Sequence, residues 1–272
     1  MATMAGNRAI TPNRARTPHP WQAAPGLSPE TPIIAIGDVH GRLDLLDGLM
    51  PWALSMAARL GGHIVLLGDY VDRGPESAGV LAYLRLMLAR NLPITPLAGN
   101  HEQMLLEFLR RPTLGRAWLR HGGRATLKSF GVAPPPPAAD MRALSRAATA
   151  LDLAMPEATQ DFLAALPLSF RSGNLFCSHA GRSRRRPVTR QPAATLVWGR
   201  GVEEAPAPWT PAQRRSGWSV QGHVTTALPL VGDNRISIET GGLEAGRALI
   251  NQVRARAAGS DSRITNDDGS EA

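Results

Sequence analysis

The segment GDVHG, residues 37–41, places a carboxylate and an imidazole two residues apart and between glycines. Side chains two residues apart on an extended backbone point the same way, so Asp38 and His40 can bind one ligand. The glycines allow the chain to turn sharply and a metal or phosphate to approach closely. Alone, the pattern describes a polar strand end followed by a turn equally well.

Four later segments repeat this chemistry: GDYVDRG, GNHE, CSHAG and QGH. With the first segment they supply six oxygen or imidazole donors: Asp38, His40, Asp69, Asn100, His179 and His223. Such donors without thiolate suit divalent cations, and six suffice for two ions if one carboxylate bridges them. Asp69, central in the series, is the natural bridge. A two-metal centre polarises a phosphoryl group and generates a hydroxide nucleophile at neutral pH. A lone histidine of this set would more often be a core residue, so the hypothesis depends on all six.

The first three of these segments each follow a short apolar run, TPIIAI, GGHIVLL or NLPITPL. Such runs are typical of strands in a sheet that is covered on both faces. Helical patterns separate them at residues 43–60, with a break or kink expected at Pro51, and at residues 76–90. The spacing of about thirty residues is that of βαβ units, whose right-handed crossovers bring the strand ends to one edge of the sheet. We therefore expect the donors to converge.

The second half of the chain changes character. Residues 110–166 have a helical pattern, with PPPP at 134–137 as a stiff linker. A hairpin about residues 172–174 follows, and then strand patterns at 217–223, 235–240 and 247–253. A second sheet therefore follows the βαβ half.

Together these motifs resemble the phosphoprotein phosphatase family of calcineurin-like metallophosphoesterases, especially its bacterial and phage Ser/Thr protein phosphatases. GDVHG, GDYVDRG, GNHE, HAG and QGH match that family's ordered motifs, and RHGGRATLKSFG and IETGG are similar to its less stringent ones. The resemblance covers residues 33 to about 250. It implies an α/β fold: a four-layer αββα sandwich of two mixed sheets flanked by helices, with a helical insertion around residues 110–166.

The resemblance also implies roles for individual residues. The first metal would be bound by Asp38, His40 and Asp69, and the second by Asp69, Asn100, His179 and His223. His101 would be the general acid, paired with Asp72, because a serine alkoxide leaves poorly without a proton. Arg73 and Arg200 would bind the phosphate, although Arg200 is indicated only by the segment VWGR.

These roles predict a dinuclear metal-dependent phosphomonoesterase that hydrolyses phosphoserine and phosphothreonine in proteins by direct attack of a metal-bridging hydroxide. Mn²⁺ is the expected metal, and Fe²⁺ or Zn²⁺ also suit the donors. An alternative within the family is a diadenosine tetraphosphate hydrolase; GNHE rather than GNHD, together with DRG, favours the protein phosphatase. A non-catalytic basic module that binds phosphate or nucleic acid is the other alternative. The complete donor set and the lack of aromatic residues among the basic ones argue against it.

Three positions depart from the family pattern and concern substrate range rather than metal binding. Ala98 stands where arginine is frequent, Val224 where Thr is usual, and Glu239 where Asp is common.

Composition limits the remaining possibilities. The chain has 272 residues and a net charge of +8. Cys177 is its one cysteine, so an intramolecular disulfide is impossible and a reducing cytoplasm is the expected compartment. We also expect a monomer. No run suits a membrane span or a secretory signal. We expect disordered tails at 1–30 and 255–272 around one metallophosphoesterase domain at 31–254. Five arginines gather directly after His179: Arg182, Arg184, Arg185, Arg186 and Arg190. They either steer acidic substrates or form a solvated loop.

Overall fold

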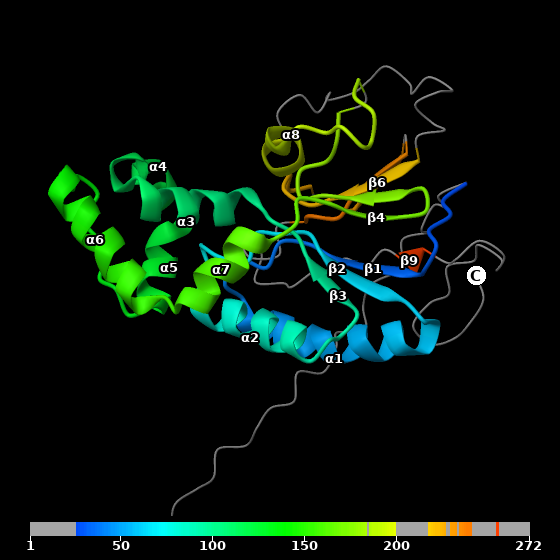
Figure 1. The fold of residues 1–272 in the computed structure, drawn as a ribbon, viewed down its shortest axis with the longest axis horizontal. Helices are drawn as coiled ribbons and strands as arrows, with labels where there is room; N and C mark the ends of the chain where they lie inside the picture. Colours follow the sequence, from blue (N-terminus) through cyan, green and yellow to red (C-terminus); the bar gives the residue numbers. More distant parts are fainter. Residues whose placement is uncertain are drawn as a thin grey trace, which may run out of the picture. The chain divides into compact units, whose positions relative to one another are not determined.

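The computed structural model describes residues 26–183, 185–199, 217–226, 229–232, 234–240 and 254–255. Its centre is a pair of β-sheets with helices on their outer sides (Figure 1). The first sheet has the strand order β3-β2-β1-β9, and the second has the order β4-β5-β6-β8-β7. None of the helices in the described ranges has the length and apolar composition needed to cross a bilayer.

The first sheet is built by the three apolar runs. Strands β1 (Ile33–Ile36), β2 (His63–Leu66) and β3 (Ile94–Pro96) are parallel, and the short β9 (Arg254–Ala255) pairs antiparallel with β1. Parallel strands end on the same edge, so the loops that follow β1, β2 and β3 lie together.

The second sheet is also mixed. The hairpin of β4 (Phe170–Ser172) and β5 (Leu175–Cys177) is antiparallel and turns at residues 173–174, as predicted. Strand β6 (Trp218–Gln221) lies parallel to β5 and to β8 (Arg235–Ser237), and β7 (Leu230–Gly232) completes the sheet. The sequence did not predict β7, and the strand expected at 247–253 lies outside the described residues.

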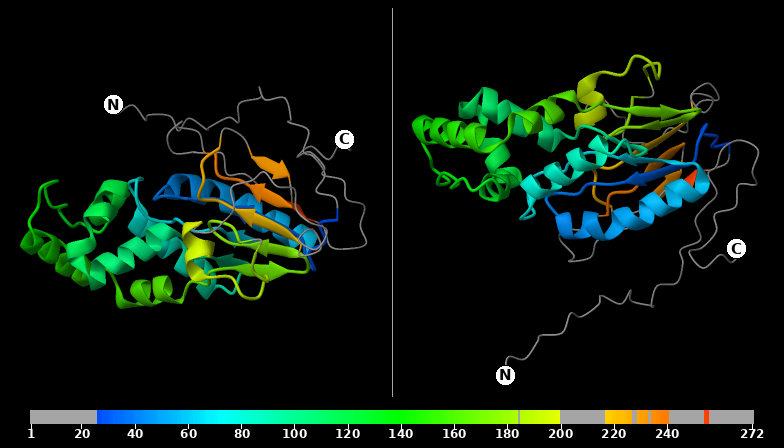
Figure 2. Two further views of the ribbon diagram at one scale, coloured as in Figure 1. Left: turned by 90° about the horizontal axis from the view of Figure 1, so that it is seen from above. Right: turned by 60° about the horizontal axis from the view of Figure 1, so that its bottom comes forward.

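Alternating side chains of β1 divide the apolar core into layers. Ile33 and Ala35 point between the sheets, toward residues such as Val220, whereas Ile34 and Ile36 pack on the helical side. Helices α1 (Leu43–Leu60) and α2 (Ser77–Ala89) cover that side (Figure 2). Helix α8 (Ala193–Trp198), which was not predicted, packs on the outer face of the second sheet. The expected αββα sandwich is confirmed.

Helix α1 runs through Pro51 without interruption, so of the break or kink expected there the break does not occur. Proline removes one backbone donor and leaves the carbonyl four residues earlier without an intrahelical partner. Here both Pro51 and Asp47 are exposed, so water can satisfy that carbonyl.

The helical insertion lies between the two sheets in the sequence. It follows α3 (Asn100–Arg110) and comprises α4 (Arg116–Trp118), α5 (Arg124–Ser129), α6 (Met141–Ala154) and α7 (Glu157–Ala165), with a 3₁₀ turn at Pro112–Leu114 and a π-helical turn at Leu119–Gly123. The proline segment joins α5 to α6, as expected.

Part of the expected N-terminal tail contacts the hairpin. The backbone N–H of Ser28 donates to Asn174 Oδ1 at 2.7 Å, and that of Glu30 donates to Ser172 Oγ at 3.0 Å. Residues 1–25 and 256–272 lie outside the described residues, and the domain limits stay a prediction.

Candidate metal centre

The six predicted donors meet at one edge of the two sheets. Asp38 and His40 follow β1, Asp69 follows β2, and Asn100 begins α3 directly after β3. His179 follows β5 and His223 follows β6. The carboxyl ends of five strands, taken from both sheets, therefore bring these side chains together. Asp38 and His223 are 185 positions apart in the sequence, yet the backbone N–H of His223 donates to Asp38 Oδ1 at 3.3 Å.

One cluster consists of three donor atoms at nearly equal separations. His179 Nε2 lies 2.9 Å from Asn100 Oδ1 and 3.1 Å from His223 Nδ1, and the latter two atoms are 3.0 Å apart. Neighbouring ligands of an octahedral ion with bonds of about 2.1 Å are about 3 Å apart. The His179 Nδ1–H donates to the Leu67 carbonyl at 2.9 Å, which leaves the Nε2 lone pair directed at the cluster. These atoms fit one divalent ion.

The other cluster is built around His40. Its Nδ1–H donates to the Val71 carbonyl at 2.9 Å, and its buried Nε2 has no hydrogen-bond partner among the described residues. That atom lies 3.9 Å from Asp38 Oδ2 and 3.6 Å from Asp69 Oδ2. A buried polar atom without a partner is costly, and a cation among these three side chains would satisfy it.

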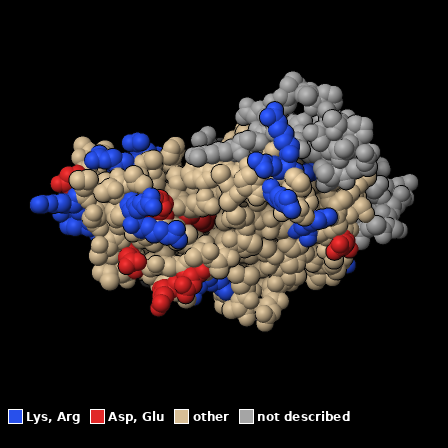
Figure 3. Space-filling model, turned by 45° about the horizontal axis from the view of Figure 1, so that its top comes forward, with Lys and Arg blue, Asp and Glu red and all other residues tan. Residues whose placement is uncertain are grey.

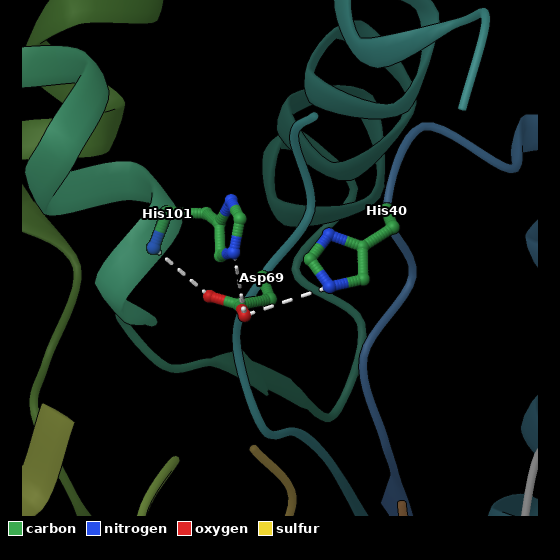
Figure 4. Close-up of side chains that lie close together, drawn as sticks. All are labelled: His40, Asp69 and His101. Carbon is green, nitrogen blue, oxygen red and sulfur yellow. Dashed lines mark hydrogen bonds and ion pairs between the residues drawn. The ribbon is translucent and has the colours of Figure 1, made fainter. Parts of the chain in front are cut away.

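Asp69 lies between the two clusters. Its Oδ2 is 3.6 Å from His40 Nε2 and 3.4 Å from His179 Nε2, while its Oδ1 accepts the backbone N–H of His101 at 3.1 Å in the first turn of α3. Figure 4 shows the carboxylate between the rings of His40 and His101. Its geometry suits the bridging role predicted from the sequence.

The backbone at the site is strained. Seven described residues other than glycine have positive φ angles, and five of them are site residues: His40, Asp69, Asp72, Arg73 and His223. Such conformations cost of the order of 1 kcal/mol or more each and persist where the surrounding structure enforces them. Close packing supplies that enforcement, because a Cβ on Gly99 would collide with the Asp69 carboxylate and one on Gly222 with that of Asp38.

Glu102 fixes the loop that carries Asp69, a role that sequence reasoning missed although the residue stands in the GNHE motif. Its Oε2 accepts the backbone N–H groups of Asp69 and Gly99, each at 2.9 Å. Its Oε1 accepts that of Tyr70 at 2.7 Å. The side chain is fully buried, so these bonds replace its hydration.

Burial sets the protonation behaviour of the site. It raises the pKa of Asp38 and of Asp69 well above the ordinary 3.8, with repulsion from Glu239 raising the first and repulsion from Asp38 raising the second. Burial also lowers the pKa of His40 and His179 well below 6.5, which keeps both imidazoles neutral. The neutral imidazoles have lone pairs that can bind a cation, and the charge of a cation would offset the repulsion between the neighbouring carboxylates.

We predict that removing divalent ions with a chelator lowers the melting temperature at pH 8 and that added Mn²⁺ restores it. Burial raises the pKa of both Glu102 and Asp72 to about 7 and that of Asp38 and Asp69 well above 3.8, so the folded protein loses stability as pH rises through the raised values and these carboxyls ionise, and a bound cation would offset that loss. Calorimetry of chelated and Mn²⁺-loaded protein at pH 8 checks this, and equal melting temperatures would contradict it.

His101 and Asp72 form a buried pair beside the clusters. The His101 Nδ1–H donates to Asp72 Oδ2 at 2.6 Å, and Trp118 Nε1–H donates to the same oxygen at 2.8 Å. Thr126 Oγ1–H donates to Asp72 Oδ1 at 2.6 Å. His101 Nε2 thereby faces Asp69 Oδ2, 3.8 Å away. The same geometry suits a general acid and a metal ligand, because ligating histidines also donate their second N–H to carboxylates.

Arg73 lies next to this pair, with Nη2 3.5 Å from His101 Nε2. It lines an open groove of about 820 Å³ together with Asp69 and His101, a position suited to phosphate. Arg200 and Arg184 lie outside the described residues.

The arginine cluster after His179 is not one surface. Arg182 is buried, and its Nη2 donates to the Gly217 carbonyl at 2.8 Å, whereas Arg185, Arg186 and Arg190 are exposed. Arg182 therefore cannot contact a ligand directly, and a steering role of the exposed arginines stays a prediction.

The departures from the family pattern also have places in the structure. Ala98 lines the groove, Val224 is exposed, and Glu239 Oε2 accepts the Asp38 backbone N–H at 3.3 Å. Glu239 thus supports the Asp38 loop, a contact across 201 residues that the sequence did not indicate.

Comparison with known proteins agrees with this geometry. The sequence model described as "Calcineurin-like phosphoesterase" matches residues 31–238, which is most of the chain. The chain belongs to the calcineurin-like phosphoesterase family. Serine/threonine-protein phosphatase 2 of Escherichia coli (strain K12) is 38% identical over 92 residues, which are 34% of this chain and 38% of the relative. Serine/threonine-protein phosphatase 1 of Salmonella typhimurium is 37% identical over 89 residues, covering 32% and 37%.

The matched segments thus span well under half of these relatives. A solved structure of a candidate diadenosine tetraphosphatase aligns with 85% of this chain and 96% of its own, at 20% identity and a TM-score of 0.52. At that identity the likeness shows that this calcineurin-like phosphoesterase shares the fold.

Proposed function

We propose that this phosphoesterase is a dinuclear metal-dependent phosphomonoesterase acting on phosphoserine and phosphothreonine in proteins. The observation that carries the proposal is the shared position of Asp69 between two donor clusters, beside the His101–Asp72 pair and Arg73. The phosphatase relatives support it, since their identity to this chain is above one third in the matched segments.

In this proposal Asp38, His40 and Asp69 would hold one ion, and Asp69, Asn100, His179 and His223 would hold the second. Mn²⁺ is our first choice of metal because oxygen and imidazole donors without thiolate suit it. When bound, such ions polarise a phosphoryl group and lower the pKa of water. The part played by the chain itself begins with Arg73, whose planar guanidinium can donate two parallel hydrogen bonds to phosphate oxygens.

His101 supplies the proton to the leaving alkoxide from Nε2. Burial, followed by the charge of Arg73, lowers the pKa of this imidazole to about 3, so in the free protein it is neutral. A phosphate dianion placed against Arg73 and His101 offsets that charge and favours the protonated imidazole. Asp72 accepts the Nδ1–H throughout, which fixes the ring with Nε2 toward the substrate.

We place the enzyme in the cytoplasm as a monomer, without nucleic acid or membrane partners. Cys177 is buried, and burial raises the pKa of its thiol to about 12, so this cysteine is unreactive and suited to a reducing compartment.

A hydrolysis panel tests the function. Protein reconstituted with Mn²⁺, Fe²⁺ or Zn²⁺ is expected to release phosphate from phosphoserine and phosphothreonine peptides and from an aryl phosphate, with kcat/KM at least tenfold higher for the peptides than for diadenosine tetraphosphate. Preferential cleavage of diadenosine tetraphosphate would instead assign an anhydride substrate. Tight phosphate or nucleic-acid binding with no turnover of any substrate would assign a binding module.

A further inference from the structure

The groove of about 820 Å³ extends from the metal centre along α3 into the helical insertion. Asn100 and His101 lie at its beginning, and Arg110, the last residue of α3, lines its far part. A helix rises 1.5 Å per residue, so about 15 Å separate the two ends. An extended peptide covers that distance with four or five residues at about 3.3 Å each.

The wall between these ends is largely apolar. Met104 and Leu106 of α3, Leu114, Leu166 and Trp198 line it. The Trp198 Nε1–H donates to Gln103 Oε1 at 2.8 Å, which fixes one edge of this aromatic ring. An apolar wall with charged groups at both ends suits a peptide anchored at two points.

The far end is basic. Glu107 lines the groove one turn before Arg110, but its Oε1 lies 3.6 Å from Arg111 Nε, so that carboxylate has a cationic partner. Arg110 itself is exposed and has no ion pair within the described ranges. It is thus the charge at this end that remains available to a ligand.

The surrounding helices strengthen this character. Residues 110–146 contain eight lysines and arginines and one acidic residue, Asp140, against a net charge of +8 for the whole chain. Figure 3 shows blue side chains on the helical half of the molecule, with red ones among them, and a second group of blue side chains on the other half. Of the eight basic residues, Arg110 is the one that lines the groove, and the others lie on the same helical part of the chain.

We propose that the groove binds the chain that flanks the phosphorylated residue and that Arg110 selects an acidic side chain four or five residues away from it. This inference rests on the proposed function and names the substrate class of the same site. In this arrangement the phosphate would bind to Arg73 at the metal centre, and apolar residues of the peptide would contact the apolar wall of the groove. A carboxylate of the peptide would bind to Arg110.

The test uses the full chain with Mn²⁺ and two phosphoserine peptides of otherwise neutral sequence. One carries Asp at the fourth and fifth positions on both sides of the phosphoserine, and the other carries Asn there. At low salt we expect kcat/KM to be about fivefold higher for the acidic peptide than for the neutral one. At 1 M salt the two kcat/KM values should become nearly equal, and kcat should differ little between the peptides under either condition. Arg110→Gln should remove the preference, and Arg110→Glu should reverse it.

The matched control is Arg142→Gln on α6, an exposed arginine of the same lobe that does not line the groove. It should keep the preference, and all three variants should hydrolyse an aryl phosphate like the unmodified protein, which shows that they fold. Equal rates on both peptides, or an equal loss in Arg142→Gln, would overturn the inference while leaving the proposed function intact. Turnover of aryl phosphate without turnover of either peptide would overturn both.

Discussion

Replacing Asp69 with Asn is expected to reduce metal-supported hydrolysis by on the order of 10⁴-fold or more. Asp69 Oδ2 lies 3.6 Å from His40 Nε2 and 3.4 Å from His179 Nε2, so this oxygen serves both donor clusters. Each bound ion would contribute several kcal/mol to transition-state stabilisation, and a neutral amide in place of the carboxylate would weaken the binding of both. The measurements are kcat with an aryl phosphate and the metal content of the dialysed protein.

The comparison variant is His223→Asn, which changes a side chain of one cluster only and which is half-buried rather than buried. It should lose less activity than Asp69→Asn and retain close to one bound ion per chain, whereas Asp69→Asn should retain fewer. Two ions and near-normal turnover in Asp69→Asn would show that the bridge is elsewhere. The metal content makes this conclusion independent of activity.

The donor clusters could be predicted because strand periodicity and glycine-flanked strand ends are local signals. Asp38, Asp69 and Asn100 each follow an apolar strand, and parallel strands that end on one edge place such residues together whatever the loops do. The second sheet obeys the same rule, since β5 and β6 are parallel and deliver His179 and His223.

What the sequence could not indicate are contacts that depend on packing between distant segments. Trp118 and Thr126 donate to Asp72 from 46 and 54 residues away, and their spacing carries no periodicity that could pair them with it. Arg182 belongs to an arginine-rich run, yet it is buried because the carbonyl of Gly217 on a neighbouring segment accepts its N–H. Composition predicts exposure for such a residue, and tertiary structure overrides it.

We expect His101→Asn to slow the hydrolysis of phosphoserine peptides by 10²- to 10⁴-fold, the range typical of general acid catalysis. The rate of aryl phosphate hydrolysis should fall far less, because a phenolate leaves readily without a proton whereas a serine alkoxide does not. Steady-state kinetics on both substrates across pH checks this, with Asp72→Asn as a companion that keeps the imidazole but removes its buried carboxylate partner.

Metal content separates the two roles that the position of His101 allows. Its Nε2 lies 3.8 Å from Asp69 Oδ2, close enough to join the His40 cluster through a shared ion. A general acid can be removed without loss of metal, so His101→Asn should retain two ions per chain while its rates on the two substrates diverge. Loss of one ion, with equal rate losses on alkyl and aryl phosphates, would instead make His101 a ligand, because a missing ion weakens the stabilisation of both transition states alike.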